Sequence, residues 1–176
     1  MLWVTRDYVH VDRVASPWLI KRFVDKQAQF IFLPRNEIPD FVAKTGAIPF
    51  DTGTGIELDH HECNGEKHCT FDAIVEKYKL EGDKALEKVR ELVRAADTGG
   101  LDRLPQAWAL ELVAVGAPLM VESDHEALEI EFPFYDTIYT YFQYQIIREK
   151  FKEDLEKLKT RGERRAFIRK KIKELK

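Results

Sequence analysis

Side chains that bind metals or react with oxidants are concentrated in one short stretch of this chain. Residues 56–72 read IELDHHECNGEKHCTFD and hold three of the five histidines and both cysteines of the protein. Imidazole, thiolate and carboxylate groups are the protein ligands of Zn²⁺, Fe²⁺ and Mn²⁺. Three interpretations stay open for this stretch: a metal site, a disulfide loop between Cys63 and Cys69, and a solvent-exposed polar turn.

A closed zinc site is one way to use the stretch. Two histidines and two cysteines would form it, namely His61, Cys63, His68 and Cys69. The spacing is unusual for such a site, because His68 and Cys69 are adjacent and project apart unless the backbone turns sharply. A disulfide is the less expected pairing, because a cytosolic protein keeps its thiols reduced.

A second arrangement uses acidic and histidine residues that follow short predicted strands at 2–5, 47–50 and 56–58. In open α/β sheets, ligand-binding groups lie just beyond the carboxyl ends of the strands. We therefore expect these residues, and an aspartate at the end of a predicted helix, to converge on a divalent metal. The predicted ligands are His10, Asp12, Asp51, Asp59, His60 and Asp97. Mn²⁺ is the first expectation, with Zn²⁺ and Fe²⁺ as alternatives.

Mixed carboxylate and imidazole ligands of this kind suit phosphoryl chemistry. Two divalent ions about 3.5 to 4 Å apart can activate a water and stabilise charge on a phosphoryl group. Asp51 would bridge such a pair. Arg13 lies three residues after His10 and is expected either to face the phosphate or to form an ion pair at a helix end. The predicted ligand is a small anionic or phosphorylated molecule.

The pattern along the chain predicts an α/β fold with a small, mainly parallel sheet, many flanking helices and a long C-terminal helical tail. A further strand is predicted at 29–33. The helix before it should begin between Arg13 and Pro17, because proline is tolerated in the first turn. Other helices are predicted at 36–44, 70–78, 83–96, 105–115, 135–160 and after Gly162. We expect a metal-binding domain at 1–145 and a basic helical tail at 146–176.

Composition places the chain among soluble globular proteins, with 44% hydrophobic and 11% aromatic residues. No run approaches the roughly 18 to 20 apolar residues of a membrane span, so we predict no membrane association and a cytoplasmic location. Residues 148–176 hold 13 basic and 6 acidic residues, and the rest of the chain holds 15 and 25. The basic tail is expected to bind nucleic acid or another anionic partner, to dock on the acidic body, or to assemble a homo-oligomer.

Several short segments are similar to a known family. They are WVTR at 3–6, HVDR at 10–13, PWLI at 17–20, RF at 22–23, PFD at 49–51, CTFD at 69–72, ADT at 96–98, DH at 124–125 and YD at 135–136. Over residues 3–142 the chain resembles the C-terminal domain of the chromate resistance protein ChrB. The resemblance implies a role in chromate resistance.

The order of four motifs also resembles the DHH phosphoesterase superfamily. The motifs are an H-x-D at 10–12, a D-T-G at 51–53, a D-H-H at 59–61 and a D-T-G-G at 97–100. This resemblance implies that His10 and Asp12 hold one metal and that Asp51 bridges to a second. It also implies that His60 and Asp97 hold the second metal and that His61 contacts the phosphate.

These observations support two functional hypotheses. The first is a divalent-metal-binding protein of the ChrB type that hydrolyses a phosphoester, with His61 and Arg13 as its catalytic residues. The alternative is a module without turnover that senses a metal, an oxyanion such as chromate, or redox state. The sequence leaves open whether the protein is an enzyme.

Overall fold

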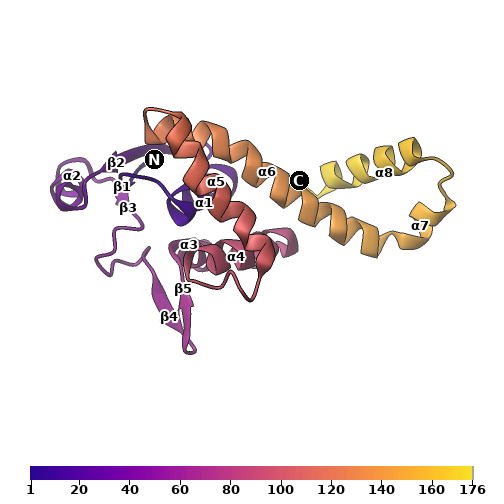
Figure 1. Cartoon of the computed structure of the whole chain (residues 1–176), viewed down its shortest axis with the longest axis horizontal. Coiled ribbons are helices and arrows are strands. Elements are labelled where there is room, and N and C mark those ends of the chain that lie inside the picture. Colours follow the sequence, from indigo (N-terminus) through magenta and orange to yellow (C-terminus); the bar gives the residue numbers. More distant parts are fainter. Residues whose placement is uncertain (176) are drawn as a thin grey trace.

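A small parallel sheet forms one end of the molecule. The computed structural model describes residues 1–175, and its main sheet has the order β2-β1-β3. The strands are β1 (Leu2–Arg6), β2 (Gln29–Leu33) and β3 (Ile48–Pro49). All pairs are parallel, with Trp3 opposite both Phe30 and Ile48. The predicted α/β class with a small parallel sheet and a long helical tail is confirmed (Figure 1).

The sheet is buried on both faces because alternate residues of β1 point to different apolar clusters. Val4 packs with Ile38 and Ala47 under α2 (Ile38–Thr45). A short 3₁₀ turn at Arg35–Glu37 precedes α2, so that helix begins two residues after the predicted start. Trp3 points to the opposite face and joins the main core, where it meets Phe50 edge to face.

The helix that follows β1 begins earlier than predicted. α1 spans Val11–Leu19 and continues as a π-helical turn at Ile20–Val24. The predicted start between Arg13 and Pro17 is wrong. The amide of Val14 already donates to the His10 carbonyl at 3.1 Å. Pro17 therefore lies inside the helix, where it removes a single backbone hydrogen bond.

The predicted strand at 56–58 is also wrong, because Ile56 has no regular structure and the two residues after it form a turn. The chain makes a separate hairpin just afterwards, from β4 (His61–Cys63) and β5 (Glu66–His68). Asn64 and Gly65 connect these strands with φ angles of 52° and 79°. Two positive φ values and an Asn-Gly pair are typical of a two-residue hairpin turn.

Three more helices of the body pack around α1, and the first of them also contacts β5 of the hairpin (Figure 1). They are α3 (Thr70–Lys77), α4 (Lys84–Asp97) and α5 (Trp108–Gly116), with 3₁₀ turns at Pro105–Ala107 and Ala117–Met120. The Asp83 carboxylate accepts from the amides of Ala85 and Leu86, and so caps α4 as predicted. The N-cap of α3 is Cys69, one residue before the predicted Thr70.

A 27-residue helix, α6 (Asp124–Lys150), links the body to the tail. It begins at Asp124 rather than at the predicted position 135, because Ser123 caps it and Pro133 is tolerated on an exposed side. The Asp124 carboxylate accepts from the amides of Tyr8 and Val9, just before α1. α6 passes without a break through the predicted domain boundary at 145/146.

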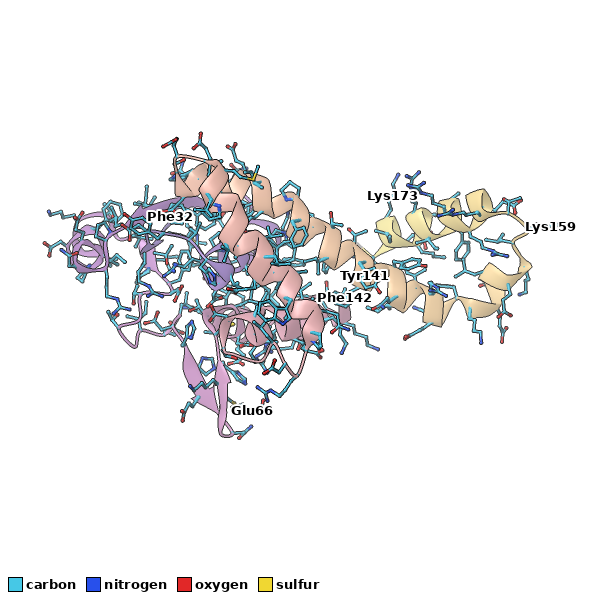
Figure 2. The ribbon with its side chains drawn as sticks, viewed as in Figure 1. Phe32, Glu66, Tyr141, Phe142, Lys159 and Lys173 are labelled. Carbon is cyan, nitrogen blue, oxygen red and sulfur yellow. The ribbon has the colours of Figure 1, made fainter. Side chains whose placement is uncertain are left out.

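The tail folds back on itself as a helical hairpin and projects from the body (Figure 1). α7 (Lys152–Lys157) and α8 (Arg161–Glu174) complete it. α8 packs along the C-terminal part of α6, and the rings of Phe151 and Phe167 meet at 5.7 Å. Figure 2 shows Lys159 at the end of the tail that lies farthest from the body. Within the described residues, no helix is both long and apolar enough to cross a membrane.

Candidate metal centre

Three aspartates surround the imidazole of His60. Its Nε2 lies 3.2 Å from Asp97 Oδ2, 3.3 Å from Asp12 Oδ2 and 3.7 Å from Asp51 Oδ1. The aspartate side chains are 2% to 15% exposed, whereas that of His60 is 46% exposed. His60 is therefore the member of this cluster that faces solvent.

Asp12 is positioned by two helices at once. It lies in the first turn of α1, and its carboxylate accepts from the amides of Thr70 at 2.7 Å and Phe71 at 3.0 Å. These amides form the N-terminus of α3, where a negative charge is favoured. The Ser16 hydroxyl also donates to Asp12 Oδ1 at 3.0 Å. Asp12 thus joins α1 to α3 and presents its Oδ2 to His60.

Asp51 follows β3 with a φ of 45°, in the left-handed region that non-glycine residues seldom adopt. Two arginines hold it there. Arg6 donates from Nε to the Asp51 carbonyl at 2.7 Å and from Nη2 to Oδ1 at 2.8 Å. Arg13 Nε lies 3.9 Å from Oδ2 and, within residues 1–175, has no hydrogen-bond partner. Asp51 therefore holds two positively charged guanidinium groups at the edge of the cluster.

Asp97 is the last residue of α4, and its Oδ2 is buried without a hydrogen-bond partner in the described chain. His60 Nε2 lies 3.2 Å away as an ion-pair contact, so the oxygen has a charged neighbour but no hydrogen bond, which is uncommon for a buried carboxylate oxygen. Candidate ligand atoms of Asp12, His60 and Asp97 all lie within 4.8 Å of one another. Two carboxylates and an imidazole suit Mn²⁺, Fe²⁺ or Zn²⁺. These residues fit a divalent cation.

Burial and neighbouring charges shift the pKa values of the side chains in the cluster. The hydrogen bond with Asp12 and the charges of Asp12, Asp97 and Asp51 raise the pKa of His60 to about 9, against the effect of burial. Burial and the Asp12 charge raise the pKa of Asp97 to about 7, and the same two causes raise that of Asp51 to about 6. Without a metal, a protonated His60 supplies the positive charge between the carboxylates.

Two of the six predicted ligands lie outside the cluster. His10 Nε2 is 3.4 Å from Glu111 Oε1 on α5 and does not reach the aspartates. Asp59 is buried but its carboxylate accepts hydrogen bonds from the loop that precedes it. The structure brings together the other four, which are Asp12, Asp51, His60 and Asp97.

The Asp59 carboxylate determines the shape of the loop at 52–56. It accepts from five consecutive amides and from the Thr52 hydroxyl, at 2.6 to 3.2 Å. Burial acts to raise the pKa of Asp59, but the hydrogen bonds from Gly53, Thr52 and Thr54 outweigh it and lower this pKa. Both oxygens are thus occupied by the backbone of the loop.

His61 belongs to a different group of side chains. Its Nε2 lies 3.4 Å from Glu76 Oε2, and His68 approaches the other oxygen of Glu76. Glu76 was not among the predicted site residues, and its one signal in the sequence is its place on the helix that follows the hairpin. Arg6 was not among them either, although it is the last residue of β1.

The cysteines take no part in either group. Cys63 and Cys69 are both free thiols, and neither belongs to a group of three metal-binding side chains in residues 1–175. Cys69 is fully buried, and burial raises its pKa well above the ordinary value. The structure therefore shows neither the disulfide nor the zinc site with two cysteines.

Comparison with known proteins identifies the family. The profile described as "ChrB, C-terminal domain" matches residues 3–142. The chain belongs to the ChrB C-terminal domain family. Protein ChrB of Cupriavidus metallidurans is 31% identical over 141 residues, which are 80% of this chain and 40% of that relative. The chain thus spans less than half the length of this curated ChrB. No solved structure matches the chain.

The region that matches the ChrB family contains the cluster but not the tail helices. All four clustered residues lie inside the matched ChrB C-terminal region, and α7 and α8 lie beyond it. The tail helices border a groove of about 1130 Å³ against the end of α6. Its basic lining residues are Arg148, Lys152, Arg161, Arg164, Arg165 and Arg169.

Proposed function

We propose that this ChrB C-terminal domain binds one divalent cation through Asp12, His60 and Asp97, with Mn²⁺ expected ahead of Zn²⁺ and Fe²⁺. The observation that carries the proposal is the buried Asp97 Oδ2, which lacks a hydrogen-bond partner in the described chain and faces His60 Nε2 at 3.2 Å. Ligands that share one ion at 2.0 to 2.1 Å lie about 2.8 to 3.4 Å apart, from adjacent octahedral positions to tetrahedral ones. The separations of His60 from Asp12 and Asp97 are close to that spacing.

The same site can hold a small anion beside the cation. Arg6 and Arg13 lie at Asp51, on the edge of the cluster, and Arg13 keeps an unpartnered Nε within the part of the chain that is described. Arginine donors match the oxygens of phosphate and related oxyanions. We therefore propose a phosphorylated molecule or a small oxyanion as the ligand.

For a phosphorylated ligand, the proposed reaction is hydrolysis of a phosphoester. A divalent cation supplies a water of lowered pKa and polarises a phosphoryl oxygen. Asp51, with its pKa raised to about 6, is suited to accept the proton of the attacking water. Arg13 is suited to stabilise the charge on the phosphoryl oxygens. His61 has no part in this scheme because it faces Glu76.

Binding without turnover is the second candidate function, and the position of His10 favours it. A DHH-type site needs His10 as a ligand, but His10 faces Glu111. The cluster therefore offers ligands for one ion. In this alternative, the cation and the two arginines bind an oxyanion such as chromate and report its presence.

Metal content tests the cation site. Wild type, Asp97→Asn and His60→Ala would be loaded with Mn²⁺, desalted and assayed by elemental analysis. His10→Ala is the matched control, because it removes a histidine that lies outside the cluster. We expect both cluster variants to hold about one ion per chain less than wild type and His10→Ala to match wild type. Equal Mn²⁺ content in all four proteins would refute the site.

An assay of phosphodiester hydrolysis distinguishes the enzyme from the sensor. Wild type and Asp51→Asn would be assayed on a generic phosphodiester with and without Mn²⁺. Hydrolysis that requires Mn²⁺ and falls at least about tenfold in Asp51→Asn supports the enzyme. No hydrolysis by the Mn²⁺-loaded protein, together with Mn²⁺-dependent binding of chromate in equilibrium dialysis, supports the sensor.

A further inference from the structure

His61, His68 and Glu76 form a second group of metal-binding side chains. His61 Nε2 lies 3.4 Å from Glu76 Oε2, and His68 Nδ1 lies 3.4 Å from Glu76 Oε1. The imidazole rings of the two histidines meet at 5.1 Å, nearly edge to face. The three residues come from β4, β5 and α3. They share no member with the cluster around His60.

His68 provides an independent sign that this group holds a ligand. It is 8% exposed, and its Nδ1 is buried without a hydrogen-bond partner in the described chain. Buried ring nitrogens are normally satisfied by a donor, an acceptor or a metal. The nearest carboxylate oxygen, Glu76 Oε1, already accepts from Arg90 Nη2. An atom placed between the two histidines and Glu76 would satisfy the nitrogen.

We propose that His61, His68 and Glu76 form a second, zinc-type metal site. Each histidine nitrogen is 3.4 Å from a different Glu76 oxygen, and one ligand atom from each residue lies within 4.8 Å of the other two. Small side-chain shifts would bring the three to the separation of about 3.3 to 3.4 Å found in tetrahedral zinc. Two imidazoles favour Zn²⁺, Co²⁺ or Ni²⁺ over Mg²⁺ and Ca²⁺. The three protein ligands leave a fourth position for water or a small ligand.

This second site is placed to organise the first. His61 follows His60 directly, so a metal on His61 would fix the backbone that carries the His60 imidazole. α3 joins the two sites as well, because its first amides bind Asp12 and its Glu76 lies in the second group. A Zn²⁺ ion here would therefore hold the hairpin against α3 and restrict the motion of His60.

The test uses the whole 176-residue chain with His60, a proposed ligand of the first site, replaced. His60→Ala would be titrated with Co²⁺, and the visible absorption of tetrahedral cobalt would be followed. The same titration would be run on a His60→Ala/His61→Ala double variant. His60→Ala/His10→Ala is the matched control, because it also lacks two histidines but keeps the second group. His61 is chosen over buried His68 because its side chain is one-third exposed and its removal spares the core.

We expect His60→Ala and the control to bind one Co²⁺ with the tetrahedral spectrum, and the His61 double variant to bind at least about tenfold more weakly. Equal titrations of all three proteins would overturn the second site. Absence of the tetrahedral spectrum from both His60→Ala and the control would also overturn it, because the ion would then depend on His60. These outcomes are independent of the proposed function, since the first site is absent throughout.

Amide hydrogen exchange gives a second readout. Zn²⁺ should slow exchange in residues 61–68 of His60→Ala and of the control, because it joins the hairpin to α3. The same ion should leave these amides unchanged in the His61 double variant. Equal slowing in the double variant would overturn the proposal.

Discussion

His60 and His61 are neighbours in the chain, but their imidazoles face different groups of side chains. His60 Nε2 lies 3.2 Å from Asp97, and His61 Nε2 lies 3.4 Å from Glu76. His60 lies in the loop before β4, and His61 is the first residue of that strand. Two adjacent substitutions should therefore have separable effects.

The affinity for Mn²⁺ should rise with pH between about 6 and 9. Metal binding requires an ionised Asp97, whose pKa is about 7, and an unprotonated His60, whose pKa is about 9. At pH 8, binding of each ion should release about one proton. Calorimetry in two buffers of different ionisation enthalpy measures that proton. His60→Ala, which lacks the site, should show no such release, and an affinity of wild type that is independent of pH would contradict the assignment.

Asp59→Ala should destabilise the protein without removing the metal site. The substitution leaves five loop amides without their acceptor, so the free energy of unfolding should fall by about 2 to 4 kcal/mol. Urea denaturation measures this loss, and exposed Glu57→Ala is the control. At saturating Mn²⁺, the folded Asp59→Ala protein should still bind as many ions as wild type. A missing ion would make Asp59 a ligand after all.

Glu131→Gln should stabilise the protein at high pH. Glu131 is 1% exposed, its Oε1 has no hydrogen-bond partner in the described residues, and burial raises its pKa to about 7. A carboxyl whose folded pKa is raised favours folding at low pH, and this contribution is lost as pH rises from about 4.5 to 7. The variant should gain about 1 to 3 kcal/mol at pH 8 and almost nothing at pH 4.

Urea denaturation at the two pH values tests this expectation. Glu129→Gln, on the exposed side of the same helix, should change little at either pH. An equal gain for Glu131→Gln at pH 4 and pH 8 would show that ionisation of Glu131 is not its cause.

The predicted binding of nucleic acid by the tail can be tested at its basic groove. Six arginine and lysine side chains line it, against the two acids Glu149 and Glu156. An Arg165→Glu/Arg169→Glu variant should bind single-stranded DNA at least about tenfold more weakly, with a shallower dependence on salt. Fluorescence anisotropy at several salt concentrations measures both quantities. Lys159→Glu/Lys173→Glu is the control, because it makes the same charge change at residues that do not line the groove. Equal binding by the two variants would indicate a different partner.

The sequence predicted the sheet well and one part of the cluster correctly. Short runs rich in β-branched and aromatic residues marked β1 and β2, and the parallel pairing of β1 with β3 placed Asp12 and Asp51 beyond neighbouring strand ends. Their proximity therefore follows from the strand order. The cost of proline was overestimated, since Pro17 and Pro133 both lie inside helices.

Two predicted ligands lie outside the cluster because other groups bind their side chains, and residue spacing does not reveal these partners. Asp59 has the same chemistry as Asp51, yet five backbone amides occupy its carboxylate. His10 was expected beside Asp12, but the start of α1 turns its ring toward Glu111. The conformations of the loop at 52–56 and of the start of α1 decide where these two side chains lie. Local sequence patterns do not specify either conformation.

The length of α6 has a mechanical consequence. At 1.5 Å per residue, its 27 residues extend about 40 Å, from the Asp124 carboxylate that holds Tyr8 and Val9 to the groove of the tail. Tyr8 and Val9 immediately precede the turn that carries His10 and Asp12. A rigid rotation of α6 would displace this turn and the tail together. A movement of the tail would therefore be transmitted along α6 to the candidate metal centre.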